Sequence, residues 1–320
     1  MNKLFTLLML WMLSCLPSLA QAPMDGGVWK DNTGKHINAH GGNIFNYKGA
    51  YYWYGESRSA DGKPYSSLGV SCFTSKDLKK WTNHGLVLPV TDEPGSDIEG
   101  GCIIERPKVL YNKKTKKFVM WFHLELKGRG YGAARYGVAT SDTPFGPFKF
   151  IRSGRVNPGI YPVGFSKPDT TDLKHQLLFP ELKAWWTPEW RKQIERGMFW
   201  MRDFEGGQMS RDMTIFIDDD GKAYHIYSSE DNLTLQIAQL TDDYMQHNGS
   251  YVRVAAGGQN EAPTIFKQDG TYWMITSGCT GWAPNAARMF KAKNIYGPWE
   301  QLANLSLIHI SEPTRLDVIS

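Results

Sequence analysis

The sequence predicts an all-β fold of repeated four-stranded units, because one hairpin pattern occurs four times. An apolar strand, a polar turn and an aromatic strand follow one another in segments 43–56, 108–123, 213–230 and 263–278. Each hairpin is followed by another alternating strand and a turn, with endings such as "FGPF" and "YGPW". Two of the three intervals between repeats are 65 and 50 residues. About four strands per repeat at this spacing is typical of the blades of a β-propeller.

The second interval is longer, 105 residues, and predicts an insert between the second and third blades. The insert covers roughly residues 157–208 and contains "WWTPEWRKQIERGMFW". Thr187 can cap a helix there, and Pro188 suits its first turn. We expect a short helical excursion on the rim; the alternative is a wall of the central funnel, built with Trp185, Trp186 and Trp200.

The N-terminal residues 1–22 read as a secretory signal peptide. Lys3 precedes an apolar run from Leu4 to Leu13, and Ala20–Ala22 forms a small-residue cleavage site. A secreted or periplasmic protein is therefore expected, with lipidation of Cys15 and anchoring at the cell surface as the alternative. No later stretch is long and apolar enough to cross a membrane. The mature chain keeps three cysteines at irregular spacing, which predicts no disulfide framework: Cys72, Cys102 and Cys279.

The composition is that of a globular protein with many aromatic side chains. Of the 320 residues 41% are apolar, enough for a sizeable core, and 12 Trp, 15 Tyr and 15 Phe are among them. Aromatic faces commonly hold the C–H faces of sugars. The formal net charge of +4 is spread along the chain, which argues against nucleic acid as a partner. A monomer that binds an oligo- or polysaccharide is the expected form.

Motifs of other chemistries give little support to a metal or a cofactor. The segment Asp218–Gly221 lacks the alternating ligands of a calcium loop and reads as a hairpin turn. His36 and His40 are four residues apart, but the glycines around them argue against the helix of a zinc protease. The sequence has neither a Gly-x-Ser-x-Gly elbow nor a phosphate loop. No metal and no cofactor are expected.

Three carboxylates stand at the start of predicted inner strands, in equivalent places of successive blades. Glu105 lies in "IIERPKVLY", Asp212 in "SRDMTIF" and Glu261 in "NEAPTIF". Because the inner strands of a propeller line its central funnel, we expect all three side chains to open into one pocket. Glycoside hydrolysis needs such groups, since an acid protonates the leaving oxygen while a base works across the sugar ring.

Six motifs in the same order resemble glycoside hydrolase family 43 over nearly the whole mature chain. They are "INAHGGNIFNYKGAYYWYGE", "IERPKVLYN", "YGAARYGVATSDTPFGPF", "SRDMTIFIDDDG", "NEAPTIF" and "TGWAPN". Within that family the chain is most similar to exo-β-1,3-galactanases and related enzymes that degrade arabinogalactan. The resemblance implies a five-bladed β-propeller and an exo-acting, inverting glycosidase. An α-L-arabinofuranosidase or β-xylosidase of the same family is the first alternative, and a non-catalytic carbohydrate-binding propeller is the second.

The resemblance also implies a role for particular residues. Glu261 corresponds to the general acid, and Glu105 to the carboxylate that tunes the pKa of this acid. The residues that correspond to contacts with the terminal sugar, or to their neighbours, are Asp212, Tyr131, Glu56, Trp282, Asn285 and Arg106.

Two features depart from the family pattern. Most members carry an aspartate base on the first blade, but "NAHGGNIF" has no acid; this branch is thought to use a glutamine of the fifth blade. Only four blades can be counted within residues 23–304. "LSLIHISEPTR", from Leu305 to Arg315, is the in-frame translation of a transposon-end sequencing adapter, so residues 305–320 read as non-native. We therefore expect about four of five blades in a C-terminally truncated, inactive chain.

Overall fold

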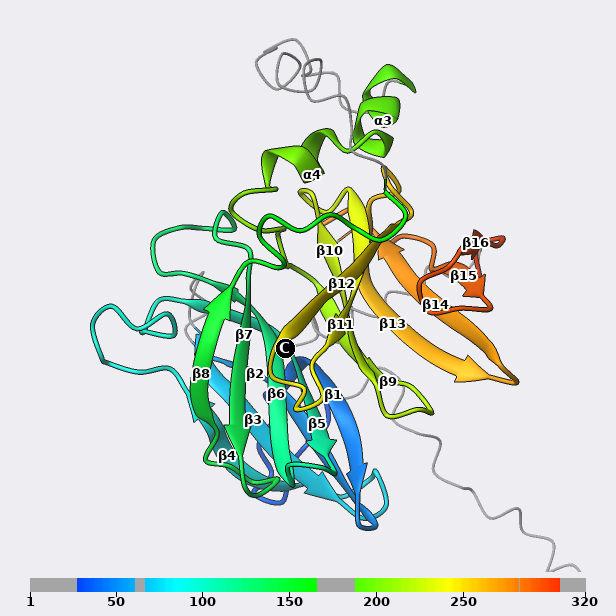
Figure 1. Ribbon diagram of the computed structural model, residues 1–320. Helices are drawn as coiled ribbons and strands as arrows, with labels where there is room; N and C mark the ends of the chain where they lie inside the picture. Colours follow the sequence, from blue (N-terminus) through cyan, green and yellow to red (C-terminus); the bar gives the residue numbers. More distant parts are fainter. Residues whose placement is uncertain (1–27, 61–66, 166–187, 282, 306–320) are drawn as a thin grey trace, which may run out of the picture.

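The computed structural model describes residues 28–60, 67–165, 188–281 and 283–305, which form four four-stranded antiparallel sheets. In each sheet the strands are neighbours in chain order, and the sheets are arranged as the blades of a propeller (Figure 1). The predicted all-β fold is confirmed. Of the sequence-based predictions, the signal peptide at 1–22 with Cys15, the residues Trp185, Trp186, Thr187 and Trp282, and the tail at 306–320 lie outside the described residues.

The blades correspond to the four repeats. Blade one consists of β1 (His40–Tyr47), β2 (Ala50–Arg58), β3 (Ser67–Ser75) and β4 (Thr82–Pro89). Blade two consists of β5 (Ile103–Asn112), β6 (Lys117–Glu125), β7 (Arg135–Ser141) and β8 (Lys149–Gly154). Blade three consists of β9 (Met213–Ile217), β10 (Ala223–Ser229), β11 (Thr234–Leu240) and β12 (His247–Val254). Blade four consists of β13 (Asn260–Gln268), β14 (Thr271–Gly278), β15 (Arg288–Ala292) and β16 (Glu300–Gln301).

Two-residue turns close the inner hairpins of blades one and four. Lys48 and Gly49 have φ values of 50° and 78°, and Asp269 and Gly270 have φ values of 49° and 67°. Positive φ at both central residues matches the right-handed twist of the flanking strands, and Gly pays no Cβ penalty there. These turns fix the register of the hairpins, so that Tyr47 faces Ala50 across the first one.

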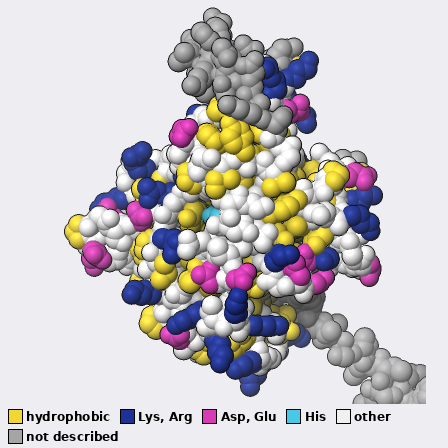
Figure 2. Space-filling view, in the orientation of Figure 1, with side chains coloured by type: hydrophobic (Ala, Val, Ile, Leu, Met, Phe, Trp, Pro, Cys, Tyr) yellow, Lys and Arg dark blue, Asp and Glu magenta, His cyan; other side chains and the backbone are white. Residues whose placement is uncertain are grey.

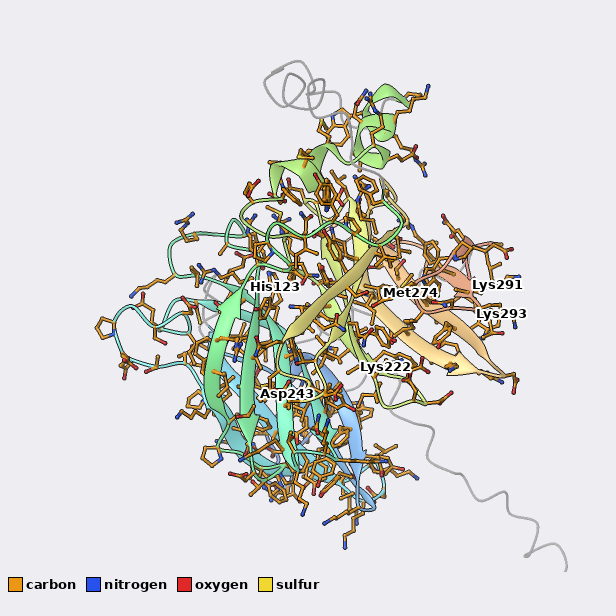
Figure 3. The ribbon with its side chains drawn as sticks, viewed as in Figure 1. His123, Lys222, Asp243, Met274, Lys291 and Lys293 are labelled. Carbon is orange, nitrogen blue, oxygen red and sulfur yellow. The ribbon has the colours of Figure 1, made fainter. Side chains whose placement is uncertain are left out.

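Three of the five hydrophobic clusters among the described residues form layers, one between each pair of neighbouring blades. Alternate residues of each strand point to opposite faces of a sheet, so that blades two and three each contribute side chains to two layers. Figure 3 shows Met274 of β14 on the side of blade four that faces blade three, with Lys291 and Lys293 at its far edge. The largest fully buried side chains of the three layers include Tyr54, Phe118 and Phe122 in the first, Trp121, Tyr227 and Tyr251 in the second, and Phe290 in the third.

The insert between blades two and three carries two short helices, α3 (Pro188–Glu195) and α4 (Met198–Arg202). They project from the rim at the top of Figure 1, and of Figure 2 in the same orientation, which agrees with the predicted helical excursion. The alternative of a funnel wall fails for Trp200, because this side chain is fully buried and its Nε1 donates to the Tyr251 hydroxyl at 2.8 Å. No helix among the described residues is long and apolar enough to span a membrane.

A buried ion pair fastens the insert to blade three, and its removal is expected to destabilise the fold. The Arg253 guanidinium donates to both oxygens of Glu230, at 2.6 and 2.7 Å, and also to the carbonyls of Ile194 and Glu195 at the end of α3. Glu230 is fully buried, so Arg253→Met would leave its charge without a partner. We expect the free energy of unfolding to fall by about 3–5 kcal/mol in urea titrations.

The matched control for this prediction is Arg191→Met. Arg191 forms an exposed ion pair with Glu195 within α3, at 3.2 Å. Such pairs contribute about 0.3–0.5 kcal/mol, so the midpoint of this variant should stay close to that of the parent protein. Equal losses in the two variants would contradict the role of Arg253.

Candidate active site

The ends of the inner strands meet around a cavity of about 330 Å³. Seven of the eight residues that the sequence singles out line it, and Trp282 is outside the described residues. The structure therefore brings together the side chains that the propeller argument expected to converge, while their individual roles stay predictions. The lining residues are His40, Glu56, Glu105, Arg106, His123, Tyr131, Arg211, Asp212, Asn232, Glu261, Ser277, Gly278, Gly281 and Asn285.

A bulge at the start of three inner strands explains why these side chains point to the centre. The strand register shifts directly after His40, Glu105 and Glu261. The next residue has a positive φ in each case: 55° for Gly41, 54° for Arg106 and 46° for Ala262. A bulge kinks its strand and re-aims the adjacent side chain. The kink thus turns one functional side chain from each of three blades into the same cavity.

Glu261 has the environment of an acid that is protonated near neutral pH. Burial raises the pKa of its carboxyl group, and the negative charge of Asp212 raises it further, to about 7. Arg106 and a hydrogen bond from Asn232 Nδ2 to Glu261 Oε1, at 2.7 Å, oppose the rise. A carboxyl group with this pKa carries its proton over much of the range in which glycosidases work.

Asp212 is held in place by a neighbouring cation and by the backbone of the next blade. Arg106 Nε and Nη2 donate to its two oxygens at 3.1 and 2.9 Å. The amide of Ala262, next to Glu261, donates to Asp212 Oδ2 at 3.0 Å. This forked geometry fixes the carboxylate as well as neutralising part of its charge. Asp212 therefore stands at a fixed position beside the candidate acid.

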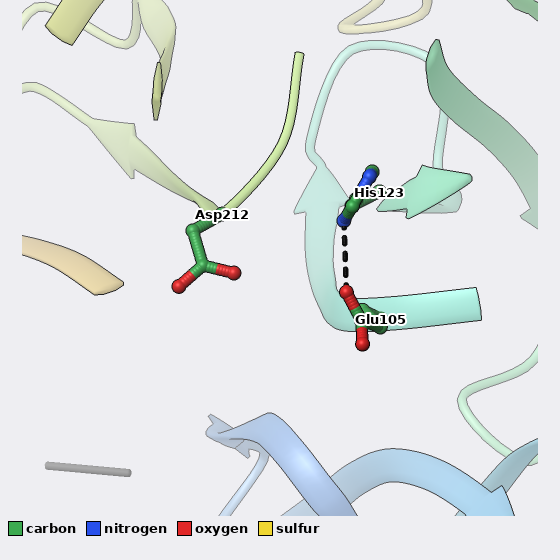
Figure 4. Close-up of side chains that lie close together, drawn as sticks. All are labelled: Glu105, His123 and Asp212. Atoms are coloured by element: carbon green, nitrogen blue, oxygen red, sulfur yellow. Dashed lines mark ion pairs between the residues drawn. The ribbon is translucent and has the colours of Figure 1, made fainter. Parts of the chain in front are cut away.

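Glu105 is ionised where Glu261 is protonated, because a buried histidine faces Glu105 (Figure 4). His123 Nδ1 lies 3.0 Å from Glu105 Oε2, and the Tyr131 hydroxyl donates to Glu105 Oε1 at 2.8 Å. Burial alone would raise the pKa of Glu105, but the hydrogen bond and charge of His123 outweigh it and lower the pKa to about 2. Glu105 is therefore ionised at the pH near 7 at which Glu261 titrates.

His123 is itself held as a cation by a second carboxylate behind it. Its Nε2 lies 2.9 Å from Oε1 of Glu125, which is fully buried. Burial works to lower the pKa of His123, but Glu105 and Glu125 together raise it to about 9. The other oxygen of Glu125 accepts from the amide of Ala134 at 2.8 Å, which ties down the loop that carries Tyr131.

Two carboxylates bear on the predicted tuning of the acid, and the role of Glu105 in it stays a prediction. The largest charge effect that raises the pKa of Glu261 comes from Asp212, while the charge of Glu105 raises the pKa of Glu56. The reason is geometric: Asp212 bonds the amide that follows Glu261, whereas Glu105 is directed at His123.

Glu56 is the most deeply buried carboxyl group of the cavity. It lies on β2, is 1% exposed and contacts His40 Nδ1; Arg58 Nη2 donates to its Oε1 at 2.7 Å. Burial raises the pKa of Glu56, and the hydrogen bond from His40 opposes this. Arg58 also lies 3.6 Å from Glu105, so that one cation links the two carboxylates.

Asn285 occupies the edge of the cavity and has a mainly structural set of contacts. Its Oδ1 accepts from the amide of Gly278 at 2.7 Å, and its Nδ2 donates to the hydroxyl of Thr280 at 2.8 Å. These bonds close the loop that follows β14. Asn285 therefore shapes the cavity wall, and a direct contact with a sugar stays a prediction.

A cation could be held only by displacing existing partners. The ligand atoms of Glu105, His123 and Asp212 lie within 4.8 Å of one another, which is a spacing suited to a metal ion. However, Arg106 occupies both oxygens of Asp212, and His123 is a cation between two carboxylates. A histidine that binds a metal ion must have a neutral imidazole ring. The charges of this group are thus balanced by protein side chains.

Sequence reasoning missed several lining residues, most importantly His123, and also Glu125, which lies behind His123 and outside the cavity lining. Both lie on β6, two residues apart, and therefore on one face of the strand. "HLE" at the end of an aromatic strand was the only available signal. Arg211 and Asn232 were missed as well: Arg211 directly precedes Asp212, and Asn232 lies in a loop whose approach to Glu261 no local pattern indicates.

The comparisons with known proteins agree with this geometry. The family model "Glycosyl hydrolases family 43" matches residues 187–316. A curated β-D-galactofuranosidase of Aspergillus niger is 22% identical over 242 residues, which are 74% of this chain and 55% of that protein. The chain thus spans about half the length of this curated relative.

Solved structures of higher identity extend the match. A GH43 β-1,3-galactosidase, solved with galactodeoxynojirimycin, is 59% identical with a TM-score of 0.81, over 87% of this chain and 80% of that chain. An exo-β-1,3-galactanase from Clostridium thermocellum is 37% identical with a TM-score of 0.69, over 88% and 51%. One from Phanerochaete chrysosporium, solved with β-1,3-galactotriose, is 32% identical with a TM-score of 0.66, over 87% and 52%. This chain belongs to glycoside hydrolase family 43.

Proposed function

We propose that the protein is an exo-acting, inverting glycoside hydrolase that removes galactose from β-1,3-linked galactan. The observation that carries the proposal is Glu261, a carboxyl group in a cavity of about 330 Å³ whose pKa is raised to about 7. The relatives at 59% and 37% identity are a β-1,3-galactosidase and an exo-β-1,3-galactanase, which supports both the sugar and the linkage.

In this mechanism Glu261 gives its proton to the glycosidic oxygen while the bond from that oxygen to the anomeric carbon breaks. Positive charge develops on the sugar ring, and the ionised Glu105 in the same cavity stabilises it without having to reorient. Water attacks the anomeric carbon from the opposite face, and the family resemblance predicts that a glutamine places it or takes its proton. The configuration at that carbon is thereby inverted.

The proposal is tested by the products that the protein, with its predicted fifth blade restored, releases from two substrates. All activity measurements described below use the same restored protein. With β-1,3-galactan we expect galactose as the released monosaccharide, and NMR at early times should show it as the α-anomer. An aryl α-L-arabinofuranoside should release no arabinose. Arabinose without galactose would replace the proposal with an arabinofuranosidase. Binding of galactan without any product would replace it with a carbohydrate-binding propeller.

The charge of Asp212 should set the upper pH limit of activity. Asp212→Asn removes the negative charge that raises the pKa of Glu261 and leaves the charge of Arg106, which lowers it. Glu261 then loses its proton at a lower pH, so the basic limb of the kcat/KM profile should move to lower pH. A profile of kcat/KM against pH measures this shift whatever the absolute rate.

The control for this prediction is Asp220→Asn, since Asp220 lies in the exposed turn after β9 and pairs with Lys222. Its profile should keep the limb of the parent protein. An unmoved limb in Asp212→Asn would show that another charge tunes the acid.

A further inference from the structure

A second cavity, of about 400 Å³, lies outside the catalytic one and is lined by three arginines. It is formed by the loop between β6 and β7, by the end of β8 and by Gly206 of the insert. Arg129, Arg135 and Arg155 supply the charge, and no acidic side chain is among the described residues that line it. A volume of this size is typical of sites for small molecules.

Two of the three guanidinium groups pair with carboxylates that stand outside the lining of the cavity. Arg135 Nη1 donates to Asp97 Oδ2 at 3.1 Å and to the hydroxyl of Ser153 at 3.2 Å. Arg155 Nη1 donates to Asp203 at 3.3 Å, but Asp203 also accepts two bonds from Arg202, at 2.9 and 2.7 Å. Arg155 therefore shares Asp203 with Arg202, which also pairs with Asp231 at 2.5 Å.

Arg129 adds a charge that no described side chain neutralises. It lies on the loop between β6 and β7, is exposed, and forms no ion pair with a described residue. Arg155 is held rigid beside it, since its Nε and Nη2 donate to the carbonyls of Ala133 and Gly132 at 3.0 Å each. A fixed guanidinium next to a free one is a suitable arrangement for a planar anion, which can accept parallel bonds from both.

The same loop forms a wall of both cavities. Tyr131 points into the catalytic cavity, whereas Arg129 and Gly132 line the arginine cavity. The loop is held from both sides, because Glu125 accepts from the amide of Ala134 and Arg211 Nη2 donates to the Tyr131 carbonyl at 3.0 Å. A branch of a glycan bound in the catalytic cavity would have to cross only this loop.

We propose that the arginine cavity, lined by Arg129, Arg135 and Arg155, binds the carboxylate of an acidic sugar carried by the glycan substrate. The planar carboxylate matches the forked guanidinium groups. That the ligand is a glycan rests on the proposed function; that it is an anion rests on the charges alone. The site would let the protein prefer galactan with acidic side chains over neutral galactan.

Titration calorimetry of the full chain with glucuronic acid tests this proposal, with glucose as the neutral twin. We expect glucuronate to bind at least about ten-fold more tightly than glucose in low salt. The affinity should fall as salt is raised, because screening shortens the range of the arginine charges. Arg129→Ala should weaken glucuronate binding about ten-fold, and Lys293→Ala on blade four should leave it unchanged.

Three outcomes would overturn the proposal. If glucuronate and glucose bind equally tightly, the negative charge of the ligand has no part in binding. If Arg129→Ala binds glucuronate as tightly as the parent protein, the arginine cavity is not the binding site. If inorganic sulfate or glucose 6-sulfate binds as tightly as glucuronate, the cavity does not prefer a sugar carboxylate. Arg129→Ala should hydrolyse neutral galactan at the parent rate. If the protein with its predicted fifth blade restored fails to hydrolyse galactan but binds glucuronate through Arg129, the proposed function alone is contradicted.

Discussion

Glu261→Gln is expected to reduce kcat on β-1,3-galactan by about 10²–10⁴-fold, because the leaving oxygen then departs without a proton. On an aryl β-galactoside with a nitrophenolate leaving group the loss should be much smaller, since this group leaves without protonation. The structural reason for choosing Glu261 is its pKa of about 7, which burial and Asp212 produce together. The two substrates should be compared at saturation over a range of pH.

The pH profile adds a second criterion to this comparison. The basic limb of the parent protein near pH 7 should disappear from the aryl-galactoside profile of Glu261→Gln, because the glutamine does not titrate. The matched control is Glu195→Gln, an exposed position at the end of α3 that should behave as the parent. Equal losses on the two substrates would mean that Glu261 acts as a structural group and not as the acid.

The blades could be predicted from the sequence because their signals are local. Turn residues with positive φ, such as Asp269 and Gly270, stand between strands that alternate, and the register follows from the turn. Each inner strand carries a β-branched apolar residue a few positions before its turn. These residues are Ile44, Val109, Ile215 and Ile265. The local sequence preferences agree with the overall fold here, and this agreement is what allows the fold to be predicted from local signals.

The site could be predicted only in part, because its chemistry depends on distances between blades. The bulges after Glu105 and Glu261 follow from similar short motifs, so the convergence of these side chains is readable. The charge state of Glu105 cannot be read from the sequence, because it is set by His123 on another strand. Which carboxylate tunes Glu261 depends in turn on the bond from the Ala262 amide to Asp212, and no spacing along the chain encodes this bond.

The largest effect away from the acid is expected for His123→Gln, which removes the cation from between two buried carboxylates. Glu105 and Glu125 lie 3.0 and 2.9 Å from the two ring nitrogens. Removing one partner of a buried ion pair leaves uncompensated charge, and we expect the free energy of unfolding to fall by about 3–5 kcal/mol. Activity should fall as well, because Glu105 would lose the interaction that lowers its pKa to about 2.

The pH dependence of this loss can be derived from the two shifts. The raised pKa of His123 contributes stability that is fully present below 6.5 and is lost as the pH rises through about 9. The lowered pKa of Glu105 contributes stability that is fully present above 4.5 and is lost as the pH falls through about 2. The difference in stability between parent and variant should therefore be greatest between these limits, at pH 4.5–6.5.

A merely structural role for His123 makes a different prediction for activity. If the imidazolium keeps Glu105 ionised, the pKa of Glu105 rises in His123→Gln, and the acidic limb of kcat/KM moves to higher pH. Glu125→Gln should cause a smaller shift in the same direction, because it weakens the cation without removing it and still accepts from the Ala134 amide. His84→Gln, at an exposed histidine hydrogen-bonded to Thr74, is the control and should leave stability and profile unchanged. A loss of stability with an unmoved acidic limb would show that His123 supports the fold and has no part in setting the charge of Glu105.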